Sequence, residues 1–308
     1  MHTFRSNGKL LLSAEYLVLK GALALALPLR KGQSLCVTFS ESSTATLLWK
    51  AFTPHGKWLE TTFEIPSFKI VETDDVQKSL LLQKILRVAK LQNTDFLIEK
   101  GTYRVSTKLD FDPNWGFGSS STLVANIAQW AEIDAFELLF QTLGGSGYDV
   151  ACALMNRPIF YHLEKNKPFI SCADFDPPFS EKLFFVYLGE KQHSGTSIRT
   201  FELFANEKDL RNEITEVSEI SEKLVSISDF DEFCSLMNRH EQLIASCTGQ
   251  TPVAARFPDF DGTLKSLGAW GGDFALALSR QPETALRNYF STHGLHTIFR
   301  YNEIVLGE

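Results

Sequence analysis

The pattern of apolar and polar positions near the N-terminus is that of a β-sheet. Two apolar runs, Leu10 to Leu19 and Ala22 to Leu29, are separated at Lys20-Gly21, and an alternating segment follows from Leu35 to Phe39. Aromatic and β-branched residues continue through residues 44 to 72 between turn signals. Because successive residues of a strand point to opposite faces, these segments are predicted to be strands joined by turns.

Helical spacing begins at Asp74 to Leu91, where apolar residues recur every three or four positions after two acidic residues suited to a helix start. Phe96 to Leu109 returns to a strand-like pattern, and a loop then separates it from an apolar helical segment, Ser119 to Trp130. Two more short helical segments are predicted at residues 135 to 142 and 150 to 155. The glycine-rich breaks therefore lie between strands and helices.

The run Asp174 to Ser180 contains Pro-Pro, which stops regular structure, and it predicts a boundary between domains of residues 1–176 and 177–308. A mixture of strands and helices follows the boundary, and the whole chain is assigned to the α+β class. The elements predicted there are strands at 183–188, 274–278 and 297–306, amphipathic helices at 210–224 and 230–244, the second capped by Ser228, and a helix at 282–292.

The composition of the chain limits which classes of function are expected. The 308 residues carry a net charge of −7 without a dense Lys/Arg run, which argues against a nucleic-acid or anionic-membrane partner. No segment approaches the roughly 20 apolar residues that cross a bilayer, and Glu15 and Lys20 interrupt the apolar N-terminal stretch that would otherwise resemble a signal peptide. The five cysteines form no C-x-x-C pair, as expected in a reducing cytoplasm. Small-molecule chemistry and a cytoplasmic location are predicted.

The segment Gly116 to Thr122 has the residues that phosphate binding needs. Its glycines allow a tight turn, the N–H groups of a first helical turn point outward, and its hydroxyls can complete a magnesium shell. A serine-capped helix after an ordinary turn explains the same residues equally well. The P-loop, the G-x-G-x-x-G fingerprint, the protein-kinase catalytic loop and the G-x-S-x-G elbow are all missing from the sequence.

Four segments together resemble the motifs of the GHMP kinases, the family of galactokinase and of homoserine, mevalonate and phosphomevalonate kinases. Ser6 to Tyr16 is similar to the first motif, Asn114 to Thr122 to the second and Gly268 to Asp273 to the third. Gly145 to Ala151 resembles the G-S-G-x-D-V-A segment of phosphomevalonate kinases. The motifs stand in the family's order and span nearly the whole chain.

The resemblance implies an α+β GHMP fold with the active site in a cleft between two domains. The N-terminal domain would hold ATP and contain a left-handed βαβ unit, and the C-terminal domain would be ferredoxin-like. It also implies transfer of the γ-phosphoryl group from Mg-ATP to a small acid in the mevalonate pathway of isoprenoid biosynthesis, with phosphomevalonate the first choice and mevalonate the second. A monomer or a homodimer fits this picture.

The residue roles are carried over by position. Lys9 and Asp149 match the catalytic pair, and Ser120 matches the magnesium ligand, so ATP and Mg²⁺ are the expected cofactors. A solvated lysine and a helix-capping aspartate are the alternatives for the pair. The expected ATP-binding residues are Asn114, Trp115, Gly116, Phe117, Gly118, Ser119, Ser120, Ser121 and Thr122. Those expected at the acceptor are Ser146, Gly147, Lys191, His193, Ser197, Gly271 and Gly272, with a polar surface loop as the alternative for residues 191–197.

The sequence departs from the family pattern in ways that keep other functions open. Asn7 replaces a proline, Trp115 and Trp270 replace small residues, and no glutamate matches the second magnesium-binding carboxylate of mevalonate kinases. Glu15 is interpreted as a structural carboxylate and His240 as a packing histidine. A non-catalytic ligand sensor and a diphosphomevalonate decarboxylase-like enzyme are the competing hypotheses.

Overall fold

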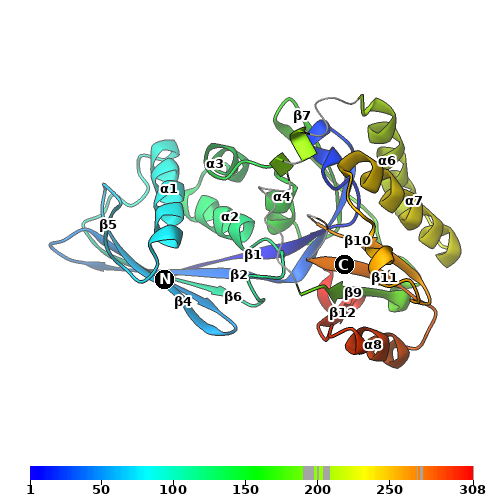
Figure 1. Cartoon of the computed structure of the whole chain (residues 1–308). Coiled ribbons are helices and arrows are strands. Elements are labelled where there is room, and N and C mark those ends of the chain that lie inside the picture. Colours follow the sequence, from blue (N-terminus) through cyan, green and yellow to red (C-terminus); the bar gives the residue numbers. More distant parts are fainter. Residues whose placement is uncertain (190–197, 200, 204–208, 269, 271–272, 308) are drawn as a thin grey trace. The chain divides into compact units, whose positions relative to one another are not determined.

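The computed structural model describes residues 1–189, 198–199, 201–203, 209–268, 270 and 273–307. The chain forms two compact units, each assembled from several segments (Figure 1). Unit 1 comprises Met1–Gly8, Lys31–Pro113 and Phe117–Leu154, and unit 2 comprises Lys9–Arg30, Asn114–Gly116 and Met155–Glu308. This division interleaves segments, whereas the boundary between residues 176 and 177 cuts the chain once, and that boundary stays a prediction.

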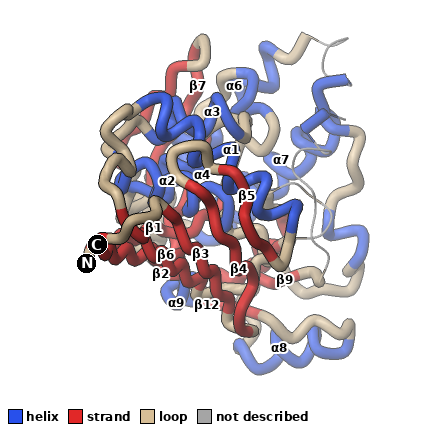
Figure 2. Tube along the Cα trace, turned by 90° about the vertical axis from the view of Figure 1, so that its left-hand side faces the viewer, coloured by secondary structure: helices blue, strands red, loops and turns tan. Residues whose placement is uncertain are grey.

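Unit 1 is built on a sheet with the strand order β5-β4-β3-β6-β2. Its strands are β3 (Thr46–Thr53), β4 (Gly56–Glu64), β5 (Lys69–Thr73), β6 (Gly101–Leu109) and the second half of β2 (Ala24–Glu41), and β1 (His2–Leu11) also pairs with β2. Figure 2 shows β6, β3, β4 and β5 as neighbours. β3 and β4 form an antiparallel hairpin, whereas β3 and β6 run parallel.

Helices cover one face of this sheet (Figure 1). They are α1 (Val76–Gln92), α2 (Ser119–Ala131), α3 (Ala135–Thr142) and α4 (Tyr148–Leu154). Alternate residues of β6 are buried and join apolar side chains of α1 and α2 in one core that includes Trp49, Phe63 and Val105. The period of two in the strands and of three to four in the helices thus places both apolar faces in the same core.

The two strands predicted around residues 22–29 and 35–39 are one continuous strand, β2, of 18 residues. The polar residues 30–34 between these two segments were wrongly interpreted as a turn. Gly32 lies within the strand because β1 crosses close to it: a Cβ atom on Gly32 would lie 2.2 Å from the Ser6 carbonyl oxygen. Residues Leu17–Lys20, predicted to belong to a strand, form a 3₁₀ helix.

Unit 2 contains an antiparallel sheet with the order β10-β11-β9-β12. The strands are β9 (Leu183–Tyr187), β10 (Thr263–Ser266), β11 (Phe274–Leu278) and β12 (Ile298–Arg300), with α6 (Arg211–Leu224) and α7 (Phe230–Thr248) between β9 and β10 and α8 (Glu283–Thr292) before β12. This βαββαβ arrangement is ferredoxin-like, as expected. β11 is buried along its whole length.

Three further features of unit 2 differ from the prediction. A hairpin of β7 (Ile159–Glu164) and β8 (Lys167–Cys172) extends the first half of β2 and had not been predicted. The last predicted strand ends at Arg300, where the Glu303 carboxylate accepts the Arg300 N–H at 3.3 Å and the short helix α9 (Tyr301–Ile304) begins. The side chain of Asp229, rather than that of Ser228, caps α7 by accepting a hydrogen bond from the Glu232 N–H at 2.8 Å.

No helix in the described ranges is long and apolar enough to cross a membrane.

Candidate active site

The start of the glycine-rich loop is fixed by the end of β6. The Asp110 carboxylate accepts hydrogen bonds from Arg5 Nη2 at 2.8 Å and from the Gly32 N–H at 2.5 Å. Two residues later, Asp112 Oδ2 lies 2.9 Å from His55 Nε2 in the β3–β4 turn. These contacts within unit 1 hold the strand end in place before the chain enters the loop.

Gly118 caps the helix that follows. Its φ of 88° lies in the left-handed region that suits glycine, and no side chain forms a cap hydrogen bond at the start of α2. The Gly118 carbonyl instead accepts from the Thr122 N–H at 2.9 Å and from Ser121 Oγ at 2.9 Å. The serine-capped helix is therefore the wrong interpretation of this loop. A glycine cap leaves the first-turn N–H groups without a side-chain acceptor at the cap, as an anion site requires.

The three hydroxyl-bearing positions after Ser119 differ in their surroundings. Thr122 is fully buried, and its hydroxyl donates to Gln33 Oε1 at 3.0 Å, which ties α2 to β2. Ser121 is buried and bonded to Gly118. Ser120 is exposed. Of the residues predicted to bind ATP, Ser120 is thus the one whose hydroxyl is best placed to meet a ligand from solvent, while Ser121 and Thr122 use theirs inside the fold.

The helix that carries Asp149 begins in a similar way. Gly147, with a φ of 91°, precedes α4, and its carbonyl accepts from the Ala151 N–H at 3.0 Å. Asp149 lies half-buried in the first turn of α4, inside the helix, and Ser146 is buried just before it. α4 packs against α2. Unit 1 therefore brings together the helices that carry Ser120 and Asp149, which come from two separate motifs of the sequence.

Unit 2 holds the remaining described part of the prediction. Lys9 is half-buried on β1, and Asn114 is exposed. Gly116 has a φ of 67°, and a Cβ atom there would lie 2.7 Å from Asp273 Oδ2. The second and third motifs therefore meet at Gly116 and Asp273. Asp273 belongs to the third motif but was not predicted to be a site residue, because the close approach of its carboxylate to Gly116 is visible only in three dimensions.

Trp115 and Trp270, which replace small residues of the family pattern, pack against other residues of unit 2. Trp270 is only 2% exposed. The Trp115 ring contacts Phe299 edge to face, with ring centroids 5.1 Å apart, and lies 6.5 Å from the ring of Tyr187. These contacts are typical of aromatic packing, so both side chains have structural roles in unit 2.

The first motif ends in a buried ionic network. Glu15 and Lys265 are both fully buried, and the Lys265 ammonium donates to Glu15 Oε1. Lys265 also donates to the Ser266 carbonyl oxygen at 2.8 Å. Burial raises the pKa of Glu15 to about 7, although the Lys265 charge opposes the shift. Glu15 is a structural carboxylate, as predicted, and Lys265 is a partner that no sequence pattern had indicated.

Helix α7 completes this network. His240 is fully buried, and its Nε2 accepts the Ala14 N–H at 2.8 Å. Burial, and next the charge of Lys265, hold the pKa of His240 well below its usual range, so the ring is neutral. The neighbouring Glu241 accepts hydrogen bonds from the Ser266 N–H, the Ser266 hydroxyl and the Val253 N–H. His240 is thus a packing histidine, as predicted.

Several predicted acceptor residues lie outside the described residues: Lys191, His193, Ser197, Gly271 and Gly272.

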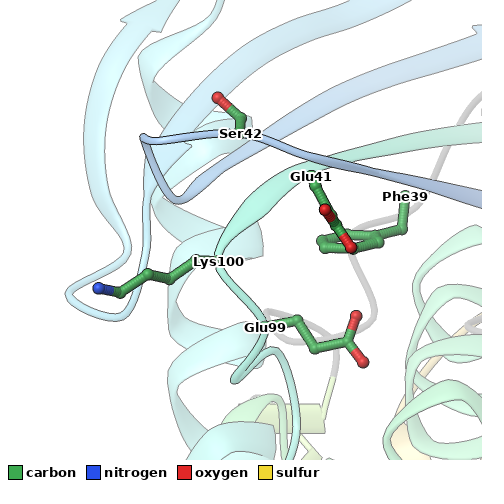
Figure 3. A pocket seen from close by; sticks show the side chains of 5 residues that line it. All are labelled: Phe39, Glu41, Ser42, Glu99 and Lys100. Atoms are coloured by element: carbon green, nitrogen blue, oxygen red, sulfur yellow. The ribbon is translucent and has the colours of Figure 1, made fainter.

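Two hollows lie away from the predicted residues. One, of 620 Å³ in unit 1, is lined by Phe39, Glu41, Ser42, Glu99 and Lys100 (Figure 3). It lies where Glu41 pairs with Gly101, at the opposite end of the β2–β6 ladder from Leu109 and the glycine loop. The other, of 360 Å³ in unit 2, is lined mainly by residues 157–158, 173–176, 301–302, 305 and 307. Neither contains a glycine-capped helix start.

The described residues contain no group of three or more His, Cys, Asp or Glu side chains able to hold a metal ion. A Mg²⁺ ion bound mostly by phosphate oxygens and water would need only a small contribution from the protein, such as one exposed hydroxyl beside a helix start. Ser120 and the start of α2 fit that requirement.

No protein-family model and no curated protein matches the chain in sequence. Several solved structures match its fold over nearly the whole length. The mevalonate kinase of Methanococcus jannaschii has a TM-score of 0.70 at 13% identity, covering 100% of this chain and 98% of that one. The phosphomevalonate kinase of Streptococcus pneumoniae in complex with phosphomevalonate and AMPPNP has a TM-score of 0.70 at 17% identity, with coverages of 97% and 100%.

The galactokinase of Lactococcus lactis in complex with galactose also matches, with a TM-score of 0.67 at 13% identity and coverages of 99% and 93%. The chain therefore has the fold of the GHMP kinases, and the resemblance predicted from its four motifs is confirmed at the level of the fold. The similar structures include both mevalonate-pathway kinases. Identities this low establish the fold and do not select a substrate.

Proposed function

We propose that the protein is an ATP-dependent kinase that transfers the γ-phosphoryl group of ATP to a small acid, with phosphomevalonate as the first-choice acceptor and mevalonate as the second. The observation that carries the proposal is the start of α2. There a left-handed glycine replaces a side-chain cap and leaves Ser120 exposed. Phosphate groups bind such helix starts through backbone N–H groups and the helix dipole. The kinases with the same fold support the same conclusion.

The residues have separate roles in this reaction. The loop from Asn114 to Thr122 holds the β- and γ-phosphates, and the Ser120 hydroxyl contributes to holding Mg²⁺. At this site a Mg²⁺ ion would supply positive charge that offsets the negative charge of the transferring phosphate. Lys9 neutralises charge on the transferred group, and Asp149 orients the acceptor. Ser146 and Gly147 contact the acceptor together with Lys191, His193, Ser197, Gly271 and Gly272, because an anionic acceptor needs cationic and N–H partners.

The choice of phosphomevalonate rests on the chemistry of Asp149. A phosphate oxygen is already ionised near neutral pH, whereas an alcohol must lose a proton during attack. The segment Gly145 to Ala151, which resembles phosphomevalonate kinases, folds as a glycine-capped helix start with Asp149 inside the first turn. An orienting carboxylate in that position suits an acceptor that needs no strong base.

A second candidate function is a ligand sensor that binds ATP without transferring phosphate. No glutamate of the sequence matches the second magnesium-binding carboxylate of mevalonate kinases, and this departure is the reason to consider the sensor. A related decarboxylase, which phosphorylates before it eliminates carbon dioxide, is a third candidate.

An ADP-release assay with Mg-ATP separates these functions. Mevalonate, phosphomevalonate, diphosphomevalonate, homoserine and galactose are offered one at a time, and gas release is followed in parallel. We expect ADP release with phosphomevalonate above the rate without acceptor. ATP binding without turnover on any acceptor contradicts the kinase and supports the sensor, and carbon dioxide release identifies the decarboxylase.

A cytoplasmic monomer or homodimer is proposed for the active form.

A further inference from the structure

The buried network around Glu15 connects its turn to four elements of unit 2. Among the described residues, the charged or titratable groups that face Glu15 are Lys265 on β10 and His240 and Glu241 on α7. α6 contributes a hydroxyl: Ser13 Oγ lies 2.7 Å from Ser221 Oγ, and Ser13 Oγ also accepts the Leu25 N–H at 2.9 Å. The turn from Ser13 to Tyr16 is therefore held by polar contacts from β2, β10, α6 and α7.

The turn is strained, and buried polar contacts maintain the strain. Ala14 has a φ of 65° and Tyr16 a φ of 63°, in the left-handed region that non-glycine residues rarely adopt. Such conformations persist where the surroundings impose them and are frequent at functional sites. Here the Ala14 N–H is anchored on His240 Nε2. Loss of that single bond would leave the strained turn without its nearest anchor.

Glu15 and the Ala14 N–H both lie beside the same atom of His240, Nε2. Glu15 Oε1 accepts from Lys265, whereas Oε2 is buried without a hydrogen-bond partner among the described residues and lies 3.4 Å from His240 Nε2. An ionised Oε2 cannot donate to Nε2, which is occupied as an acceptor by Ala14. A protonated Oε2 carries an O–H that can donate to Nε2 and compete with the Ala14 N–H.

The turn is connected to two parts of the candidate active site in unit 2. On one side, Glu15 follows Lys9 by six residues, through the end of β1 and the Leu12 N–H, which donates to the Leu25 carbonyl at 2.9 Å. On the other side, Lys265 and Glu241 hold Ser266, two residues before Gly268 of the third motif. Burying an ion pair costs free energy of desolvation, so the pair of Glu15 and Lys265 contributes little net stability by itself. Its role here is to fix the position of the turn from Ser13 to Tyr16 against β10.

We propose that Glu15 is a positioning residue of the kinase. Ionised Glu15 leaves the Ala14 N–H on His240 and fixes the turn after the Lys9 strand relative to β10. Protonated Glu15 donates to His240, displaces Ala14 and loosens the turn, so acceptor binding weakens as the pH falls and Glu15 takes up a proton. The kinetic part of this inference rests on the proposed function, whereas the structural part does not.

Hydrogen exchange of the Ala14 amide tests the structural part in the full-length protein. Corrected for intrinsic exchange, its protection is expected to be about fivefold higher at pH 8 than at pH 6, the effect of weakening one buried hydrogen bond. Glu15→Gln places an N–H donor where the protonated acid has one, so low protection at both pH values is expected. Glu216→Gln, in the exposed pair of Glu216 and Arg239 between α6 and α7, is expected to behave as the wild type.

Equal protection of Ala14 at pH 6 and 8 in the wild type overturns the inference, and this measurement does not depend on whether Glu15→Gln folds. A pH dependence that Glu216→Gln also abolishes overturns it too, because the effect would then belong to the helices in general. For the kinetic part, the KM for the acceptor is measured from pH 6 to 8. It should rise about fivefold on acidification in the wild type and stay high in Glu15→Gln, with the KM for ATP unchanged.

Failure of the proposed function would be distinct, since no acceptor would release ADP at any pH while the exchange of Ala14 still depended on pH. Turnover with a pH profile that Glu15→Gln leaves unchanged would contradict the inference alone.

Global stability gives a third readout. Burial raises the pKa of Glu15 from 4.5 to about 7, so the native state binds more protons in that window and stability falls as the pH rises through it. The Tm of the wild type should decline more steeply over this range than that of Glu15→Gln.

Discussion

The start of α2 and the turn from Ser13 to Tyr16 are both motifs of the same family resemblance, yet they use polar groups in opposite ways. At the start of α2 a glycine caps the helix, Ser120 is exposed, and no side-chain charge lies within the segment Gly118 to Thr122. In the turn, Glu15 is fully buried against Lys265 and His240. One motif presents backbone and hydroxyl groups to solvent, and the other withdraws its charges into the core.

This difference separates ligand binding from positioning. Backbone N–H groups at a helix start can bind an anion without a conformational change, because their orientation is set by the helix. A buried carboxylate cannot reach a ligand, and its contribution is to hold its own chain segment in one conformation. Substitutions in the turn from Ser13 to Tyr16 should therefore act through geometry, and substitutions at the start of α2 through direct loss of a contact.

The largest effect is expected from Lys9, which lies on the strand that leads into the buried turn. Removing the charge in Lys9→Ala should lower kcat with phosphomevalonate by about 10²- to 10³-fold, since a charge that stabilises the transferring group has this order of effect. Asp149→Asn should lower it by less than about tenfold, because an ionised phosphate acceptor needs orientation more than a base. Steady-state ADP release at saturating ATP measures both.

Two results would change this interpretation. An equal collapse of the rate in Lys9→Ala and Asp149→Asn would favour an alcohol acceptor, and mevalonate would become the first choice. Retention of most of the rate in Lys9→Ala would remove Lys9 from the catalytic pair. Circular dichroism of both variants serves as the control for folding.

A smaller effect is expected within the loop itself, where Ser120 and Ser121 form a matched pair. Ser120→Ala should lower kcat about 10- to 100-fold and raise the Mg²⁺ concentration needed for half-maximal rate, because an exposed hydroxyl is lost from the metal shell. Ser121→Ala removes the bond to the Gly118 carbonyl and should mainly lower stability, by about 1 kcal/mol. If both variants shift the Mg²⁺ dependence equally, the distinction between exposed and bonded hydroxyls has no functional meaning.

Much of the fold could be predicted because its periodicity is local. Helices at residues 76–92, 119–131 and 135–142 and the strand at 274–278 agree with the spacing of apolar residues. β2 was predicted as two strands because Gly32 interrupts its apolar pattern. Only glycine fits at this position, since the backbone of Ser6, which is remote in sequence, lies too close for a side chain. The β7–β8 hairpin lay in a stretch from which no element had been predicted, and its outer strand β8 is mostly exposed, so it lacks the alternation that marks a half-buried strand.

The candidate site was predictable to a different extent in its two regions. Glycines and serines at the start of α2 suggest phosphate binding by their type and spacing. The structure excludes the serine cap, and phosphate binding stays a proposal. Lys265 gave no such signal, because a buried lysine on a strand looks like any charged residue in the sequence. The same is true of the approach of Asp273 to Gly116, since it depends on how β11 is placed within unit 2.

The smallest expected effect concerns that approach, and Gly116 and Gly144 form the matched pair that tests it. Both glycines have a left-handed φ, 67° and 70°, but a Cβ atom on Gly116 would lie 2.7 Å from Asp273 Oδ2, whereas one on Gly144 would meet nothing within 4 Å. Alanine at either position should cost about 1 kcal/mol in backbone strain. Gly116→Ala should cost about 1 kcal/mol more, because the carboxylate must move. Thermal unfolding would show the difference as a lower Tm for Gly116→Ala, and Asp273→Ala combined with Gly116→Ala should recover it. Equal Tm values for the two single variants would mean that the second and third motifs are not tightly packed against each other.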